Sequence, residues 1–292
     1  MRSARRIVTS THDRRFTPAR PDLAAERLRG IVDAPRYATP RVMRVVEECA
    51  PVSPEPRRDV PIDTQALHGE RVDVYELDSE GWAWGQLRRD GYVGYMPAEC
   101  LRADSAPATH RVAVTRAHVY PGPNMKLPPV AALPLNAEVT AGAPNGDFLP
   151  VDGVGFVWRA HLVASEVFET DFVAVAERFL HAPYLWGGKT ICGIDCSGLA
   201  QASLAACGRF VPRDTDVMEN FLATRVEPTE ALDGLRRGDL VFWKGHVGVM
   251  RDASELLHAN GHFMRVTSEP LRVARDRILA KGAGPITSIR RP

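Results

Sequence analysis

The sequence predicts an α+β chain in which two small all-β barrels precede a domain of helices followed by antiparallel strands. The chain has 292 residues, more than one ordinary core requires. Residues 41–105 and 108–165 each contain short alternating runs separated by turn residues. From residue 166 the apolar spacing becomes helical and strands follow, which is the order of an α+β domain and not of a parallel sheet.

Residues 1–40 are predicted to form an N-terminal arm. The run MRSARRIVTSTHDRR has five arginines and one aspartate, which favours a solvated tail over a membrane-surface or nucleic-acid arm. The arginines are not followed by the apolar stretch of a secretory signal, so we expect no export by that route. The later stretch LAAERLRGIVDA suggests a helix or an arm lying against another domain.

Composition and charge limit the partners and the compartment. A net charge of +1 argues against general nucleic-acid binding, and no window approaches the ~18 apolar residues of a membrane-spanning helix. An odd number of scattered cysteines favours reduced thiols over a disulfide framework. We therefore expect a cytoplasmic protein with no nucleic-acid and no membrane partner. The five cysteines are Cys49, Cys100, Cys192, Cys196 and Cys207.

The two all-β segments look like variations on one unit. In the first, ERVDVYEL, GWAWGQLR and GYVGYMP are separated by turns at Gly81 and at Asp90-Gly91. The second repeats this order and also ends in an aromatic strand after a glycine turn. Barrel packing accounts for most of the aromatic side chains, with one or two left to face a ligand. These aromatics are Trp82, Trp84, Tyr92 and Tyr95.

The last domain, 166–292, begins with a predicted helix over EVFETDFVAVAERFLHAP that Pro183 closes. A second helix is predicted from Ser197 to about Cys207. A strand over GDLVFWKGHVGVM and another over ELLHANGHFM follow, joined by a short turn. Helices therefore come first and antiparallel strands second.

Two readings of the sequence CGIDCSGL and its neighbourhood fail on spacing. The segment GGKT resembles a phosphate-binding loop, but Pro183 stands where that loop needs a glycine. A zinc site at Cys192 and Cys196 would need a second close pair of Cys or His, and a redox pair is normally C-x-x-C and not C-x-x-x-C. We therefore expect no metal and no cofactor.

The remaining interpretation is that Cys196 is a nucleophile in the first turn of a helix. The partial positive charge of a helix N-terminus favours a thiolate, so the position is expected to lower the pKa of the thiol. Asp195 is a candidate N-cap and Ser197 adds a polar group, and either could instead contact a substrate.

A nucleophilic cysteine also needs a base, and the best candidates are His246 and His258 on successive strands. If the strands pair so that His258 lies opposite Gly248, both rings project from one face, with room left by the missing side chain of Gly248. Cys196 would then attack, His246 would transfer the proton, and His258 would orient that imidazole as a neutral third residue.

Four blocks closely resemble the NlpC family of papain-fold cysteine peptidases over about 168–292: YLWGGKTICGIDCSGLAQ, RDTD, RRGDLVFWKGHVGVM and LLHAN. The resemblance implies a papain-like domain with Cys196 as nucleophile, His246 as base and His258 as third residue. It also implies substrate contacts by further residues, although a helix cap would account equally for the last of them. These residues are Tyr184, Asp195, Ser197 and Thr215.

The pattern GWAWGQLR followed by DGYVGYMP is similar to the bacterial SH3-type barrel. Two SH3-like barrels before the peptidase domain resemble γ-D-glutamyl-L-diamino-acid endopeptidases. This resemblance implies that the first barrel narrows the cleft, so that an acidic group and a tyrosine hold a free N-terminal amine. The candidates are Glu70 with Tyr92 or Tyr95.

The expected function is therefore hydrolysis of the γ-D-glutamyl to L-diamino-acid bond of murein-derived peptides with free N-terminal L-Ala, in cell-wall peptide recycling. Three alternatives remain open. They are a secreted hydrolase of intact peptidoglycan, a cell-wall-binding protein without activity, and an amidase or acyltransferase that uses the same Cys-His site.

Overall fold

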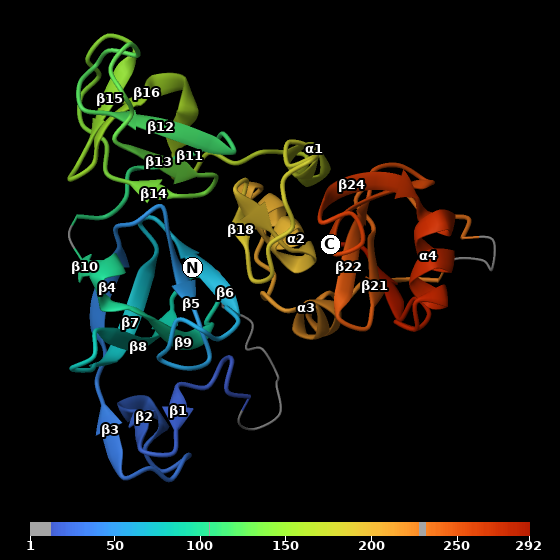
Figure 1. The fold of residues 1–292 in the computed structure, drawn as a ribbon, viewed down its shortest axis with the longest axis horizontal. Helices are drawn as coiled ribbons and strands as arrows, with labels where there is room; N and C mark the ends of the chain where they lie inside the picture. Colours follow the sequence, from blue (N-terminus) through green and yellow to red (C-terminus); the bar gives the residue numbers. More distant parts are fainter. Residues whose placement is uncertain (1–12, 105, 228–231) are drawn as a thin grey trace.

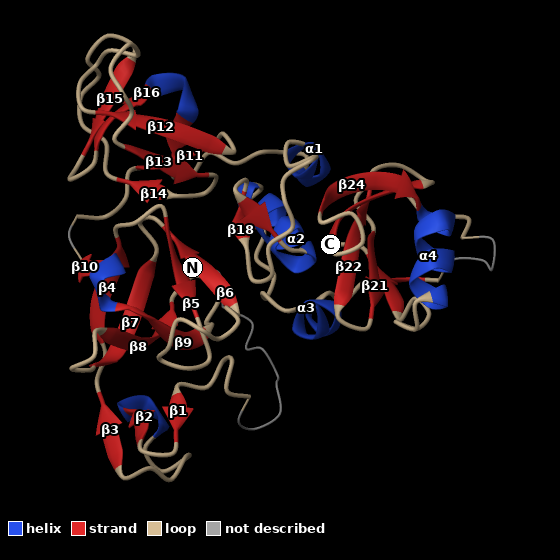
Figure 2. Cartoon of the chain, viewed as in Figure 1, coloured by secondary structure: helices blue, strands red, loops and turns tan. Residues whose placement is uncertain are grey.

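The computed structural model describes residues 13–104, 106–227 and 232–292. Along the chain these residues form a small N-terminal sheet, two β barrels and a C-terminal domain that contains both helices and a large sheet (Figure 1). Figure 2 shows that the α-helices lie in the C-terminal domain, whereas the preceding parts consist mainly of strands and loops. The predicted α+β class is confirmed.

The N-terminal part is a three-stranded sheet packed against the first barrel. Its middle strand, β2 (Leu23–Ala25), pairs with β1 (Ala19–Arg20) and β3 (Arg36–Ala38), and only Glu26–Leu28 forms a 3-10 turn, η1. The expected α-helix at LAAERLRGIVDA is therefore wrong, and the segment instead packs against the first barrel as strands. Leu23 explains the outcome, because it is buried in one cluster with Trp84 of the first barrel.

The first barrel has a five-stranded sheet in the order β10-β4-β7-β8-β9 and a separate hairpin, β5-β6. Its strands fall within the predicted range 41–105 and enclose a core that includes Tyr92. Trp84 is also buried, whereas Trp82 and Tyr95 are partly exposed. The strands are β4 (Arg41–Val45), β5 (Cys49–Val52), β6 (Thr64–Leu67), β7 (Arg71–Leu77), β8 (Trp82–Leu87), β9 (Val93–Pro97) and β10 (Leu101–Ala103), with η2 at Ala98–Cys100.

The second barrel has a three-stranded and a four-stranded sheet, in the orders β14-β11-β17 and β13-β12-β16-β15. Its strands fall within the predicted range 108–165 and share an aliphatic core. They are β11 (His110–Val112), β12 (Arg116–Tyr120), β13 (Ala131–Pro134), β14 (Glu138–Val139), β15 (Phe148–Val151), β16 (Gly155–Trp158) and β17 (Leu162–Ala164), with η3 at Arg159–His161.

The C-terminal domain is built on a six-stranded sheet in the order β20-β25-β21-β22-β23-β24, with helices on both faces (Figure 1). Helix α2 shares an apolar core with β21 and β22, and α4 shares another with the same sheet. The helices are α1 (Phe172–Glu177), α2 (Cys196–Ala206), α3 (Thr215–Phe221) and α4 (Leu271–Ala280). The strands are β18 (Lys189–Thr190), β19 (Gly193–Ile194), β20 (Arg225–Val226), β21 (Leu240–Trp243), β22 (His246–Met250), β23 (Glu255–Asn260), β24 (Arg265–Pro270) and β25 (Ser288–Arg290).

Two elements of this domain differ from prediction. The expected single strand over GDLVFWKGHVGVM is a hairpin, since Trp243 pairs with His246 across a two-residue turn in which Gly245 has a positive φ of 74°. The expected helix over 166–182 is an α-helix only at Phe172–Glu177, where the carboxylate of Asp171 accepts from the backbone N–H of Val173 and Ala174. The hairpin turn makes His246 the first residue of its strand.

No helix among the described residues has the length and apolar character needed to cross a membrane.

Candidate active site

The helix that carries Cys196 is capped by Asp195. One carboxylate oxygen of Asp195 accepts from the backbone N–H of Gly198 at 2.7 Å, and the other accepts from Gly187 at 2.8 Å. The helix begins at Cys196, one residue earlier than expected. A Cβ at Gly198 would lie 2.2 Å from the carbonyl oxygen of Gly188, so only glycine fits this first turn. The cap and the glycine together fix the position of the thiol.

Burial dominates the electrostatics of Cys196. The residue is 8% exposed, and desolvation with the charge of Asp195 raises the pKa of its thiol to about 12. The backbone N–H groups of Val247 and Ser197 donate to the sulfur and oppose that rise, but they do not reverse it. The expectation of a lowered thiol pKa is therefore wrong. The resting nucleophile is a protonated thiol that needs a base.

The structure brings the two predicted histidines together. Val249 pairs with Leu257, and the same register continued by one residue places His258 opposite Gly248, as the sequence argument required. The Nε2 atom of His246 lies 2.8 Å from Nδ1 of His258. The expectation that Gly248 leaves room for the two imidazoles is wrong, because a Cβ at Gly248 would lie 2.6 Å from the side chain of Leu256. Leu256, and not the imidazoles, occupies that space.

A carboxylate behind His258 extends this pair. Nε2 of His258 lies 2.8 Å from Oε1 of Glu269 on β24, and Arg277 of α4 forms an ion pair with the same oxygen. Burial acts to raise the pKa of Glu269, but the hydrogen bonds and charges of His258 and Arg277 outweigh it and lower that pKa. His258 is therefore not isolated, because an ionised carboxylate that Arg277 compensates lies within hydrogen-bond distance of its ring.

These contacts fix the tautomers of both rings. His258 donates its Nε2–H to the Glu269 carboxylate, so its Nδ1 is an acceptor. His246 then donates from Nε2 to that acceptor, which leaves its own Nδ1 with a free lone pair. The backbone N–H of Val247, the residue after His246, donates to the sulfur of Cys196, so the strand that carries His246 passes next to the thiol.

A cavity of about 270 Å³ is lined by Cys196, by residues of the N-terminal segment and the first barrel, and by other loops of the C-terminal domain. Four residues expected to contact the substrate line it, and so does Tyr92 from the first barrel. The four are Tyr184, Asp195, Ser197 and Thr215. Thr215 is the first residue of α3, and the N-cap position belongs to Asp214, whose side chain makes no capping hydrogen bond, so the capping alternative for Thr215 is wrong. We call this cavity the cysteine pocket.

Tyr92 meets an acidic residue in the cysteine pocket that was not assigned a role from sequence. Its hydroxyl donates to Oδ2 of Asp214 at 3.1 Å. Burial raises the pKa of the Asp214 carboxyl, and the guanidinium groups of Arg213 and Arg15 oppose the rise. Asp214 belongs to the motif RDTD, but the sequence does not indicate that Tyr92 of the first barrel contacts it.

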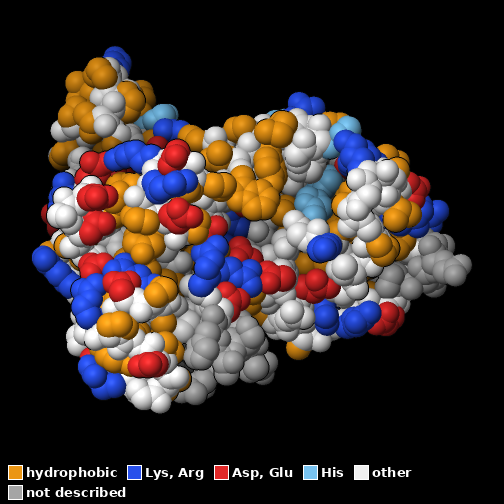
Figure 3. Space-filling view, turned by 60° about the horizontal axis from the view of Figure 1, so that its bottom comes forward, with side chains coloured by type: hydrophobic (Ala, Val, Ile, Leu, Met, Phe, Trp, Pro, Cys, Tyr) orange, Lys and Arg blue, Asp and Glu red, His pale blue; other side chains and the backbone are white. Residues whose placement is uncertain are grey.

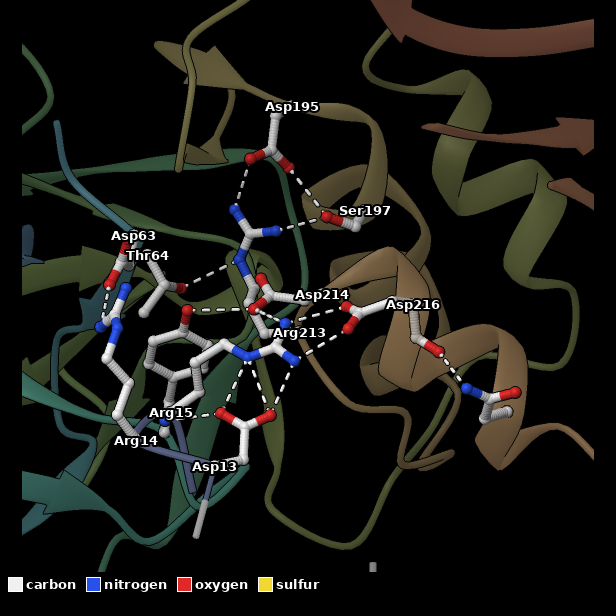
Figure 4. A network of polar contacts seen from close by, with 12 residues as sticks. Asp13, Arg14, Arg15, Asp63, Thr64, Asp195, Ser197, Arg213, Asp214 and Asp216 are labelled. Atoms are coloured by element: carbon white, nitrogen blue, oxygen red, sulfur yellow. Dashed lines mark hydrogen bonds and ion pairs between the residues drawn. The ribbon is translucent and has the colours of Figure 1, made fainter. Parts of the chain in front are cut away.

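Arg213, from the same block, organises the nucleophile's surroundings (Figure 4). Its buried guanidinium donates to Asp195 and to the hydroxyl of Ser197, each at 2.6 Å, and to Thr64 of the first barrel at 2.9 Å. The contacts of Asp195 and Ser197 in this structure are therefore structural, whatever further contact each makes to a substrate.

Glu70 and Tyr95 are not part of the cysteine pocket. Glu70 is buried in an ion pair with Arg89 at 2.9 Å and lines a different cavity, of about 460 Å³, where both barrels meet the C-terminal domain. Tyr95 lies on β9, and its hydroxyl accepts from Arg20 of the N-terminal part at 3.1 Å. The choice of Glu70 and Tyr95 as amine ligands is therefore corrected. Of the three barrel candidates, only Tyr92 lines the pocket.

Cys192 does not share the environment of Cys196. It is exposed in the turn between β18 and β19, and its sulfur contacts Arg116 of the second barrel and lies 3.9 Å from Glu48. All five cysteines are unpaired. Across the described ranges, no group of three or more His, Cys, Asp or Glu side chains is arranged to hold a metal ion.

A capped helix that starts with a buried thiol, next to a strand that starts with an oriented imidazole, defines a cysteine hydrolase of the papain type. The NlpC/P60 family model matches residues 181–279, and the model described as "Bacterial dipeptidyl-peptidase Sh3 domain" matches residues 52–101. The chain belongs to the NlpC/P60 family and is a cysteine peptidase. Its predicted architecture, SH3-like and papain-like parts together, is confirmed.

Several known proteins are similar to this chain. The gamma-D-glutamyl-L-lysine dipeptidyl-peptidase of Bacillus subtilis is 32% identical over 226 residues, which cover 68% of this chain and 72% of that protein. Dipeptidyl-peptidase 6 of Lysinibacillus sphaericus is 24% identical over 239 residues, 74% of this chain and 86% of the relative. A solved NlpC/P60 family protein from Bacillus cereus superposes with a TM-score of 0.70 at 18% identity, covering 86% of this chain and 99% of the other, and supports the fold.

Proposed function

We propose that this protein hydrolyses the γ-D-glutamyl to L-diamino-acid bond of murein stem peptides that carry a free N-terminal L-Ala. The observation that carries the proposal is the Tyr92–Asp214 pair in the same pocket as Cys196. A carboxylate backed by a hydroxyl is a partner for an ammonium group, so the pocket offers an amine site near the nucleophile. Relatives named for γ-D-glutamyl-L-lysine cleavage support the choice of bond.

The charge of the cysteine pocket favours a cationic group. Three of its lining residues are arginines and four are aspartates. The buried pair Arg213–Asp195 is internally compensated, which leaves an excess of carboxylates around Asp214. A peptide with a free amine is therefore favoured over one whose nitrogen is amide-linked and uncharged. The imbalance resides in Asp63, Asp214 and Asp216, against Arg14 and Arg15.

The proposed reaction proceeds in two stages. Nδ1 of His246 takes the thiol proton of Cys196 while the sulfur attacks the γ-carbonyl carbon of D-glutamate. The tetrahedral intermediate collapses to a thioester as the imidazolium returns the proton to the departing amine of the diamino acid. Water, deprotonated by His246, then hydrolyses the thioester and regenerates the thiol. Tyr184 lines the same pocket as Cys196 and is proposed to contact the reacting acyl group.

The experiment that tests this function is mass spectrometry of the products from defined peptides. L-Ala-γ-D-Glu-diaminopimelate and the corresponding lysine peptide should each be tested with a free and with an acetylated N-terminus. We expect L-Ala-D-Glu from the free peptides and little product from the acetylated ones. Digestion of whole sacculi would support the secreted hydrolase instead, transfer of the acyl group to an added amine would support the acyltransferase, and no turnover of any peptide would support the wall-binding protein.

A role in cell-wall peptide recycling inside the cytoplasm is part of the proposal. A stem peptide has a free amine once it is no longer amide-linked to sugar, so a requirement for that amine suits a recycling enzyme. The five unpaired cysteines suit a reducing compartment. Fractionation of cells that express the full chain, followed by immunodetection, tests the compartment.

Replacement of Glu269 by Gln is expected to lower kcat by about 10-fold to 100-fold with little change in KM. The amide can still accept from His258, but it carries no charge to hold the ring in the required tautomer or to stabilise the imidazolium that forms at His246. Steady-state kinetics on the tripeptide gives both constants. Glu255→Gln, on β23 with its carboxylate on Ser268, is the matched control and should leave kcat unchanged. Equal losses in the two variants, or a change confined to KM, would contradict a positioning role.

The pH profile of kcat/KM is expected to lack an acid limb at the ordinary histidine value. Burial, the second imidazole and Arg277 lower the pKa of His246 to about 3. A lowered pKa keeps the ring unprotonated as the pH falls below 6.5, and it also makes the ring a weaker base towards the thiol proton. Rates measured with the tripeptide from about pH 5 to about pH 8 should be nearly constant on the acid side. A fall in kcat/KM centred near pH 6.5, without a matching fall in the affinity for the peptide, would contradict this prediction.

A further inference from the structure

The N-terminal segment 13–16 reaches into the cysteine pocket from the first barrel. The backbone N–H of Val93 on β9 donates to the carbonyl oxygen of Arg15 at 2.8 Å, and the ring of Phe16 stacks edge-on against Tyr92 at 5.5 Å. Gln86 on β8 donates to the carbonyl oxygen of Phe16 at 3.1 Å. The segment is therefore fixed to the barrel by its own backbone, independently of any substrate.

The side chain of Arg15 crosses from this segment to the C-terminal domain. Its Nη1 atom lies 2.8 Å from Oδ2 of Asp214 and 2.9 Å from Asp216, and its Nη2 atom lies 2.8 Å from the second oxygen of Asp216. Asp13 holds the other edge of the guanidinium at 2.7 Å. A planar fork with five N–H donors suits this three-carboxylate arrangement, which a lysine could not reproduce. Figure 3 shows basic and acidic side chains close together on the face between the barrels and the C-terminal domain.

The position of Arg15 relative to Asp214 decides what it can do. In Figure 4, Asp195 and Ser197, which flank the nucleophile in sequence, lie on one side of Asp214, and Arg15 with Asp13 lies on the other. Arg15 lines the pocket and its side chain is only 22% exposed. A peptide whose amine reaches Asp214 therefore meets the guanidinium next, and not open solvent.

We propose that Arg15 determines specificity by closing the cysteine pocket beyond Asp214, so that only a peptide that ends at its amine fits. This inference rests on the proposed function, because it names the residue that enforces the free N-terminus. An acyl or sugar substituent on that nitrogen would have to displace a guanidinium held by three carboxylates. Extended substrates are thus excluded by a charged wall that the N-terminal segment supplies, in addition to the barrel itself.

The test compares the tripeptide L-Ala-γ-D-Glu-diaminopimelate with its N-acetyl derivative in the full-length protein and in Arg15→Ala. We expect kcat/KM for the acetylated peptide, relative to that for the free peptide, to rise by about 10-fold or more. Loss of one positive charge beside Asp214 does not weaken an ammonium ligand, so the selectivity ratio should fall through gain on the blocked peptide. Arg29→Ala is the matched control, since this exposed arginine of the same N-terminal part pairs with Glu26 and does not line the pocket.

Each result decides one question. Equal loss on both peptides in Arg15→Ala would overturn the proposal, because it would show that Arg15 only supports the fold of the pocket. A lower KM for the free peptide with no gain on the acetylated one would also overturn it and make Arg15 a competitor for Asp214. If Arg15→Ala does not fold, Arg15→Lys keeps the charge, loses the fork, and should shift the ratio in the same direction. A wild-type protein that cleaves neither peptide, or both equally, would refute the proposed function instead.

Discussion

Replacement of Cys196 by Ala is expected to reduce release of L-Ala-D-Glu from the tripeptide by about four orders of magnitude or more. The thiol sulfur is the atom that would form the thioester, and no neighbouring side chain can replace it. The other groups that line the pocket offer hydroxyls, carboxylates, guanidiniums and an indole. Turnover followed by mass spectrometry measures the loss. Because Ala fits the first turn of α2, the variant should fold and still bind the peptide, which calorimetry of binding can check.

Cys192→Ser is the control for this experiment and should retain nearly all activity. Its sulfur faces Arg116 and Glu48 at the contact with the barrels, and not the cysteine pocket. A variant at Cys192 with the same loss as Cys196→Ala would mean that the two thiols act together. Full activity in Cys196→Ala would remove the nucleophile from the proposed mechanism.

The parts of the fold that depend on local patterns, such as turn residues and alternating apolar residues, could be predicted from the sequence. Turns at Gly81 and at Asp90-Gly91 separate strands whose alternation is visible in the printed sequence, and the order of β22 and β23 follows from the same reasoning. The strand at Leu23–Ala25 could not be predicted this way, because its propensity is helical and its structure is decided by burial against Trp84. The two-residue turn at Gly245 was hidden inside an apolar run that reads as one strand.

The chemistry of the site was predictable where it depends on position along one element, and not where it depends on distant parts of the chain. Cys196 and the two histidines lie at a helix start and on neighbouring strands, which local patterns indicate. The pKa of the thiol was predicted in the wrong direction, because the helix position is visible in sequence and the degree of burial is not. Glu269, Asp214 and Arg15 were missed for a related reason, since each acts through a contact made only after the chain has folded.

Replacement of Arg213 by Met is expected to lower the free energy of unfolding by about 3 to 5 kcal/mol. Arg213 is 1% exposed and supplies the compensating charge for Asp195, so its loss leaves a buried carboxylate without a counter-ion. The change also breaks the hydrogen bond to Thr64, one of the contacts that join the first barrel to the C-terminal domain. Urea unfolding followed by tryptophan fluorescence measures the effect as an earlier first transition. Activity should fall with it, because Asp195 caps the helix that carries Cys196.

The control is Arg237→Met, which removes an arginine of the same domain from carboxylates at the surface. Arg237 pairs with Asp171 and Glu177 and is 39% exposed, so solvent already screens its charge and a loss of about 1 kcal/mol or less is expected. A second arm removes both buried charges in Asp195→Asn with Arg213→Met, which should cost less than the sum of the two single changes, because neither charge is then left alone. If the single change at Arg213 costs no more than the one at Arg237, or if the paired changes simply add, the buried ion pair does not hold the nucleophile's helix in place.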